Sequence, residues 1–303
     1  MRLAAALATV YLVWGSTYLA IAVAERTLPP LLMLSVRFLV AGGLLYAWCV
    51  RRGHLAADRP GRREWLSAAV IGALLLAFET GVLALAEKRV ATGLAALLVA
   101  SVPLFMAVID RVFYGVRIAP AAVLGILTGL AGVGLLAGAS GGADPVGVGL
   151  ILAGALAWTV GSVYARRAPQ PRSILLFTAM QMLAGGLELA VFGAARGELG
   201  QVHLASVSAV SALSFVYLVF VGAIGAYTAY GWLLKHSSTP VLTSYAYVNP
   251  AVAVVLGWGL AGEQIGAREL VSGFVILASV ALLLLPRTAG RKARAAAPAT
   301  VDV

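Results

Sequence analysis

The chain has 303 residues, of which 61% are hydrophobic and only 11% are charged, and its mean hydropathy is +0.97. Soluble domains carry about 25% charged residues, and no water-soluble fold of this length could bury so much apolar surface. The net charge of +10 does not indicate nucleic acid, because the basic residues lie between apolar segments and not together on one face. We therefore predict an all-α integral membrane protein with no nucleic-acid partner.

Ten runs of about 20 mainly apolar residues, the length needed to cross a bilayer, follow one another along the chain. The sequence predicts transmembrane helices at 3–23, 31–50, 66–86, 91–110, 119–137, 146–165, 173–193, 210–234, 241–261 and 270–285. The first run is longer than a usual signal core, so we expect it to remain uncleaved as a helix. The basic, alanine-rich stretch 287–303 lacks apolar periodicity and is predicted to be a disordered cytoplasmic tail.

Lysine and arginine residues are distributed unevenly between the two sets of loops. With the N-terminus inside, the cytoplasmic segments carry 16 of the 22 basic residues, the outer loops carry 5, and Arg37 lies within a helix. Because the cytoplasmic side carries the excess, both termini are predicted to be cytoplasmic in a multi-pass protein of the inner membrane.

An internal repeat divides the chain into two halves, predicted at 1–142 and 143–286. Trp14 and Trp158 are 144 residues apart, the segment 41–44 matches 184–187 at a spacing of 143, and 101–103 matches 248–250 at 147. Five helices per copy is an odd number, so the second copy must enter the membrane upside down. Inverted repeats around a central cavity are typical of secondary transporters.

Nine short motifs occur in order between about residues 9 and 285. They are 12–18 (LVWGSTY), 28–30 (LPP), 37–38 (RF), 86–87 (AE), 93–98 (GLAALL), 102–105 (VPLF), 161–164 (GSVY), 244–250 (SYAYVNP) and 262–263 (GE). Together they resemble the EamA family of the drug/metabolite transporter superfamily, and most of all its YedA-like exporters. The resemblance implies a basket of ten helices whose cavity is lined mainly by helices 1, 3, 4, 6, 8 and 9.

Aromatic side chains are predicted to line that cavity, because a site for organic metabolites needs flat apolar walls with a few polar tips. Trp14 and Tyr18 recur at helical spacing with Thr17 beside them, so they can face one way. The second half adds further candidates, which are Trp158, Ser162, Tyr227, Tyr230, Tyr245 and Asn249. The alternative, an interfacial aromatic belt, suits residues near segment ends such as Trp65 better.

Three ionisable residues interrupt predicted spans, where each costs about 2.5–3.5 kcal/mol on insertion scales. Arg37 and Glu79 lie at similar depths from the outer boundary, and we predict that they form an ion pair; Glu79 is also a candidate substrate ligand. Glu188 is close enough to the outer end to extend its carboxylate to the interface. Asp110 lies at the inner boundary, where a solvated position needs no special role.

Two pairs of residues are candidates for gating or structure. Glu87 and Glu263 each end an outward-running helix, where they could gate the outer mouth or simply be solvated. Pro103 and Pro250 occupy equivalent positions of the fourth and ninth predicted helices, where each favours a kink that could act as a hinge or stay rigid.

Metal and cofactor chemistry is not expected. The chain has one cysteine, Cys49, and its three histidines, His54, His203 and His236, all fall in connecting segments.

The sequence predicts a secondary transporter that exports small metabolites, amino-acid-like compounds or amphipathic drugs by alternating access. The alternative is an integral-membrane enzyme acting on a lipid-linked substrate, but such an enzyme needs clustered His, Asp or Ser near an interface, and no such cluster occurs. Without a Walker-type loop, direct ATP drive is not expected either. The expected partners are a small-molecule substrate and the lipid bilayer; the oligomeric state is open, and a monomer is compatible with the sequence.

Overall fold

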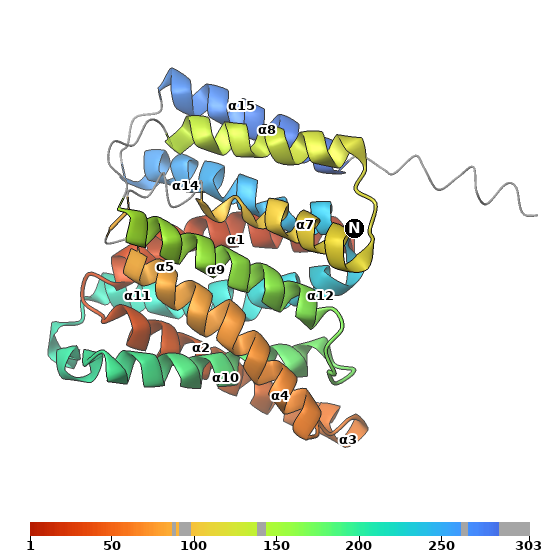
Figure 1. Cartoon of the computed structure of the whole chain (residues 1–303). Helices are drawn as coiled ribbons and strands as arrows, with labels where there is room; N and C mark the ends of the chain where they lie inside the picture. Colours follow the sequence, from red (N-terminus) through yellow and green to blue (C-terminus); the bar gives the residue numbers. More distant parts are fainter. Residues whose placement is uncertain (87–88, 91–97, 138–143, 262–265, 285–303) are drawn as a thin grey trace, which may run out of the picture.

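The computed structural model describes residues 1–86, 89–90, 98–137, 144–261 and 266–284 (Figure 1). Every element of regular secondary structure in this part of the chain is a helix, which confirms the all-α prediction. The first half contains α1 (Arg2–Ala24), α2 (Pro30–Arg51), α3 (His54–Ala57), α4 (Arg62–Ile71), η1 (Gly72–Phe78), α5 (Glu79–Ala86), α7 (Val102–Tyr114) and α8 (Pro120–Ala137).

The second half follows a similar order of helices. It contains α9 (Pro145–Ala165), α10 (Ile174–Ala195), η2 (Glu198–Gln201), η3 (Leu204–Ser206), α11 (Ala209–Tyr217), η4 (Leu218–Tyr227), α12 (Thr228–His236), α13 (Thr239–Thr243), α14 (Tyr245–Ala261) and α15 (Ala267–Leu284). The segments η1 and η4 are π-helical, and each continues the helices on both sides without a break.

Six of the continuous helices are long and apolar enough to cross a membrane. They are α1, α2, the run α4–η1–α5, α9, α10 and the run α11–η4–α12, and their ends lie within four residues of the predicted spans. Among the shorter described helices, α7, α8, α14 and α15 are the longest, with 13, 18, 17 and 18 residues. The predicted span 91–110 begins outside the described residues, and the predicted span 241–261 is divided at Ser244.

Side chains and prolines fix where several helices begin. Pro30 and Pro145 occupy the first positions of α2 and α9, where the missing N–H is not needed. Asp144 caps α9 by accepting the Val146 N–H at 2.9 Å, and it also accepts a hydrogen bond from Arg89 at 3.1 Å. The hydrogen bond from the Val146 N–H, and to a smaller extent the one from Arg89, stabilises the charged carboxylate, so the pKa of Asp144 lies below its usual value.

Helices pack closely wherever small residues face a neighbour. A Cβ atom on Gly42 of α2 would lie 2.9 Å from Met182 Cβ of α10, and the Ser35 hydroxyl of α2 donates to the Gly186 carbonyl at 2.8 Å. The pair α8 and α15 is built in the same way, because the Ser279 hydroxyl donates to the Gly125 carbonyl at 2.8 Å. Figure 1 shows this second pair side by side at one edge of the bundle.

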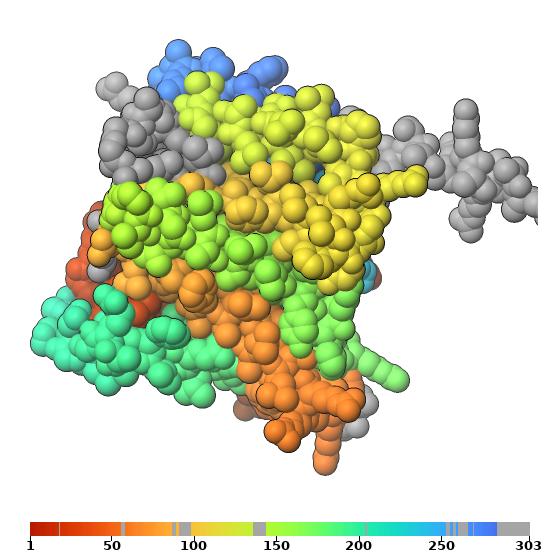
Figure 2. All heavy atoms as spheres, viewed as in Figure 1, coloured from red at the N-terminus to blue at the C-terminus, as the bar shows by residue number. Residues whose placement is uncertain are grey.

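The outer surface of the bundle is apolar. Figure 2 shows a face formed by α4, α5, α7, α8 and α9, and large side chains on this group of helices are exposed, among them Leu66, Val108, Leu124, Leu127 and Leu156. Exposed apolar side chains on several neighbouring helices fit contact with lipid chains.

Candidate functional site

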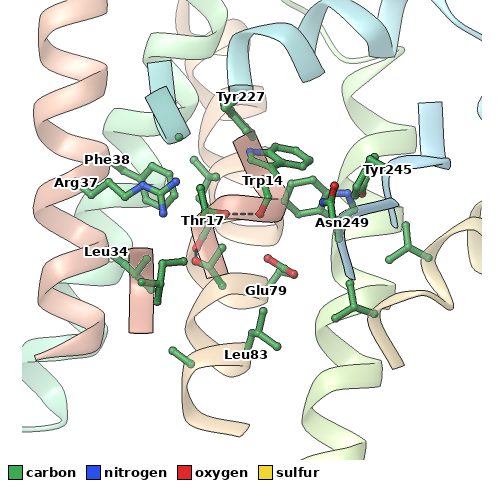
Figure 3. A pocket seen from close by; sticks show the side chains of 18 of the residues that line it. Trp14, Thr17, Leu34, Arg37, Phe38, Glu79, Leu83, Tyr227, Tyr245 and Asn249 are labelled. Carbon is green, nitrogen blue, oxygen red and sulfur yellow. Dashed lines mark hydrogen bonds between the residues drawn. The ribbon is translucent and has the colours of Figure 1, made fainter. Parts of the chain in front are cut away.

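A pocket lies among α1, α2, η1, α5, α7, α9, η4 and α14, with about 140 Å³ of space open to the centre of a water molecule (Figure 3). We call it the aromatic pocket. It extends from Trp14 in the middle of α1 to Glu25, which follows the last residue of that helix. Seven of the ten residues predicted to bind substrate line it, and these are Trp14, Thr17, Glu79, Trp158, Tyr227, Tyr245 and Asn249.

Rings from α1, α9 and α14 form one end of the pocket, and a ring from α12 packs behind them. The Trp14 ring is 5.5 Å from that of Trp158 and 5.1 Å from that of Tyr245, and both contacts are edge-to-face. Tyr230 lies 5.1 Å from both tryptophan rings. Such contacts orient the rings and stabilise each pair by about 0.5–1.5 kcal/mol, so this wall is held rigidly.

Two of the predicted residues lie behind this wall. Tyr230 is 1% exposed, and its hydroxyl lies 2.6 Å from the Ser162 hydroxyl, so the pair supports the rings from outside the pocket.

The Tyr18 side chain lies outside the described residues. The Tyr11 hydroxyl is 2.5 Å from that of Ser244, and this bond ties α1 to the junction of α13 and α14.

Hydrogen bonds also fix the polar groups of the pocket residues Asn249 and Tyr227. In the amide orientation that satisfies its neighbours, Asn249 donates to the carbonyls of Tyr245 at 3.1 Å and Tyr11 at 3.2 Å. The Tyr227 hydroxyl donates to the side-chain oxygen of Gln181 at 2.7 Å. Gln181, a buried amide on α10 that orients Tyr227, was not among the residues predicted from the sequence. A polar residue within an otherwise apolar span was the signal that could have identified it.

Arg37 is buried in the pocket wall and is held by the π-helical segment η4. Its Nε donates to the Leu218 carbonyl at 3.1 Å, and its guanidinium carbon lies 5.0 Å from the Phe38 ring centroid. A Cβ atom on Gly222 would lie 2.9 Å from Arg37 Nη2, so glycine leaves the space that the guanidinium occupies.

The predicted ion pair between Arg37 and Glu79 is not observed among the described residues, where the ion pairs seen are Arg89–Asp144 and Arg166–Asp110. Both side chains line the pocket, and Figure 3 shows them on different walls. The predicted depths were therefore compatible, but the Leu218 carbonyl at the start of η4 draws the guanidinium away from the carboxylate.

The two π-helical segments occupy equivalent places beside the pocket. Glu79 follows η1 directly, and Tyr227, which lies 148 residues later, is the last residue of η4. In each case a side chain adds a hydrogen bond to a carbonyl of the segment, from Thr80 to Leu76 and from Arg37 to Leu218. Such wide helical turns are rare and occur frequently at functional sites.

The remaining predicted residues have other surroundings. Pro103 is in the first turn of α7 and lines a different pocket, whereas Pro250 is buried within α14. Glu87 and Glu263 lie outside the described residues. Glu188 does not fully reach the surface as expected, because its Oε2 is buried and has no hydrogen-bond partner within the described part of the chain.

Comparison with known proteins gives a consistent result. The profile of the EamA-like transporter family matches residues 2–138 and again residues 145–285. The inner membrane transporter YedA of Escherichia coli K12, itself described as uncharacterized, is 40% identical over 92% of this chain and 90% of its own length. A probable terminal-alkyne amino-acid exporter of Streptantibioticus cattleyicolor is 27% identical over 83% of this chain and 84% of its own. A crystal structure with 22% identity matches 92% of this chain and 95% of its own, with a TM-score of 0.73.

Proposed function

Because the chain belongs to the EamA-like transporter family and carries two copies of its domain, we propose that it exports small metabolites, amino-acid-like compounds or amphipathic drugs by alternating access. That it is a membrane transporter and not an enzyme follows from the family itself. The cargo class, the direction and the mechanism are the proposal. The observation that carries it is a pocket whose walls combine large aromatic rings with charges of both signs.

The chemistry of the pocket fits an amino-acid-like zwitterion. Arg37 can attract a carboxylate on one wall, while Glu25 and Glu79 can attract an ammonium group. The rings of Trp14 and Tyr245 offer a flat surface for an organic side chain. The exporter of Streptantibioticus cattleyicolor, named for an amino-acid cargo, supports this class of cargo.

The proposed architecture has ten transmembrane helices arranged as two inverted five-helix repeats, with both termini in the cytoplasm of an inner-membrane protein. The basic residues support this orientation, with 16 on the inner side and 5 on the outer side. The connecting segments support helices that cross in alternate directions. The segments 52–61, 115–119 and 166–173 lie at one end of the bundle, and the segments 25–29 and 196–208 lie at the other (Figure 1).

A thermal-shift screen of the purified full-length protein tests the cargo class. Amino acids, lipophilic drugs and lipid-linked sugars are added separately, because a ligand at 100 times its Kd stabilises the native state by about 2.7 kcal/mol. We expect amino-acid-like compounds to raise Tm, and we expect Trp14→Ala to remove the shift. A shift produced only by lipid-linked sugars would contradict the proposed class of cargo.

A further inference from the structure

A second charged cluster lies far from the aromatic pocket, at the ends of α7, α9 and α13. Arg166 Nη1 is 3.6 Å from the Asp110 carboxylate and donates to the Thr239 hydroxyl at 2.8 Å. The Thr239 hydroxyl in turn donates to the Asp110 carboxylate. Asp110 is only 4% exposed, so it is not the solvated boundary residue that the sequence suggested.

A neighbouring contact joins two of the same helices. The guanidinium carbon of Arg167 lies 3.4 Å from the ring centroid of Tyr114, the last residue of α7. Two consecutive arginines following α9 therefore hold α7, one through an ion pair and one through a cation–π contact. Removing one partner of the buried pair would leave the other charge uncompensated.

This cluster borders a second pocket, which we call the inner pocket, with about 190 Å³ of space open to the centre of a water molecule. The two pockets follow one another along the same helices. On α7 the aromatic pocket contacts Val102, whereas the inner pocket contacts Pro103, Ala107 and Asp110. On the other side the inner pocket contacts Thr239 and Thr243 of α13, and the aromatic pocket contacts residues of α14. The charged cluster therefore lies at the end of the inner pocket that is remote from the aromatic pocket.

The internal repeat provides no equivalent cluster at the opposite end. With the repeat spacings of 144, 147 and 148 residues, Arg166 corresponds to Ala22, Asp110 to Gly257 and Thr239 to Ala91. None of these three residues can form an ion pair or a side-chain hydrogen bond. The repeat therefore does not duplicate the contact among Asp110, Arg166 and Thr239, and this contact favours the conformation in which its own end of the bundle is closed.

The cluster is also incompletely satisfied. The Nε and Nη2 atoms of Arg166 are buried and have no hydrogen-bond partner within the described part of the chain. A partly satisfied buried network stabilises the closed end less than a complete one would, which keeps the contact reversible.

We propose that Asp110, Arg166 and Thr239 form a latch that closes the cytoplasmic end of the transporter while the aromatic pocket is open to the outside. This inference rests on the alternating-access part of the proposed function. Opening the latch would expose the inner pocket to the cytoplasm and close the aromatic pocket.

Two matched reporters test the latch in the full-length protein in lipid nanodiscs. Ala107 lines the inner pocket and Ala84 lines the aromatic pocket, and each is 7% exposed. Each is replaced by cysteine in a Cys49→Ala background, and the rate of maleimide modification is measured. With Asp110→Asn we expect the rate at Ala107→Cys to rise at least fivefold and the rate at Ala84→Cys to fall. Arg166→Gln should act in the same way, so one variant that fails to fold does not end the test.

Arg89→Gln is the matched control, because it breaks the exposed Arg89–Asp144 pair and should change neither rate. A faster rate at Ala107→Cys without a slower rate at Ala84→Cys would indicate local fraying and overturn the latch. Unchanged rates at both reporters would overturn it as well. The labelling needs no cargo, so a negative cargo screen would count against the proposed substrate class and not against the latch.

Discussion

Trp14 contacts the rings of Trp158 and Tyr245 in the aromatic pocket and the ring of Tyr230 behind them, so it is the residue on which the proposed cargo surface most depends. We expect Trp14→Ala or Trp158→Ala to lower transport at least tenfold while folded protein remains in the membrane, because the flat wall is lost. Trp14→Phe should retain much of the activity. The measurement is efflux from proteoliposomes, with size-exclusion chromatography as the test of folding.

Trp65 provides the control for these variants, since it lies near a helix end, is 36% exposed and contacts Tyr46 and not the pocket. Trp65→Ala should leave transport unchanged. Full transport by both Trp14→Ala and Trp158→Ala would rule out the aromatic pocket as the cargo site.

Arg37 and Glu79 allow a second prediction for single residues. Arg37→Met leaves the Leu218 carbonyl without its donor, and we expect a loss of about 1–3 kcal/mol in the free energy of unfolding. Without a direct ion pair, the losses for Arg37→Met and Glu79→Gln should add to within about 0.5 kcal/mol in the double mutant. A coupling energy above about 1 kcal/mol, measured by denaturant unfolding in detergent, would show that the pair forms after all.

Much of the site could be predicted from residue spacing alone. Trp14 and Thr17 share a helix face, and the repeat led directly to Trp158. Gln181 and Asp110 could not be assigned in this way, because their partners lie on segments far away in the sequence. Gln181 on α10 accepts a hydrogen bond from Tyr227 at the end of η4, and Asp110 on α7 accepts one from Thr239 at the start of α13. Arg37 lines the pocket together with Glu79, but its hydrogen-bond partner is a backbone carbonyl that no side-chain pattern reveals.

At the scale of elements, close contact between η1 and α10 depends on Gly72. A Cβ atom there would lie 2.7 Å from the Gln181 carbonyl oxygen and 2.7 Å from the Gly185 nitrogen, both backbone atoms that cannot move aside easily. We expect Gly72→Ala to lower the free energy of unfolding by about 1–3 kcal/mol. Gly43, in α2, has no atom within 4 Å of its added Cβ, so Gly43→Ala should be neutral or stabilising by up to about 1 kcal/mol. Equal effects of the two substitutions on Tm would contradict this contact.

Helix positions were predicted well because long apolar runs bounded by charges are strong signals. The two π-helical segments were not predicted, since a run such as 218–226 is apolar on every side and gives no periodicity from which the turn size could be read. The division of the ninth predicted span at Ser244 was missed for a similar reason. At this point the Ser244 hydroxyl lies 2.5 Å from the Tyr11 hydroxyl and donates to the Val241 carbonyl at 2.7 Å.

At the scale of the whole molecule, the proposed orientation can be tested by labelling. In a Cys49→Ala background, Arg59→Cys in the loop before α4 and a cysteine at Thr288 should react with an impermeant maleimide only in inside-out vesicles. Modification of either site in intact cells would reverse the proposed topology. The proposed orientation depends on the excess of basic residues in the cytoplasmic loops. One site lies in the first half of the duplicated chain and the other follows the second half, so the result would also show whether this excess marks the cytoplasmic side in both halves.

The pairing of α8 with α15 has a consequence for how the chain is made. The two helices end the two halves, and Ala267 follows Ala137 by 130 positions in the chain. At about 5–20 residues per second, the ribosome needs about 7–26 seconds to supply α15 after α8 has been completed. During this interval the small-residue surface around Gly125 and Gly129 has no Ser279 or Leu283 against it. A nascent chain that stalls before α15 therefore carries an incomplete helix pair at the edge of its bundle, where membrane quality-control proteases can recognise it.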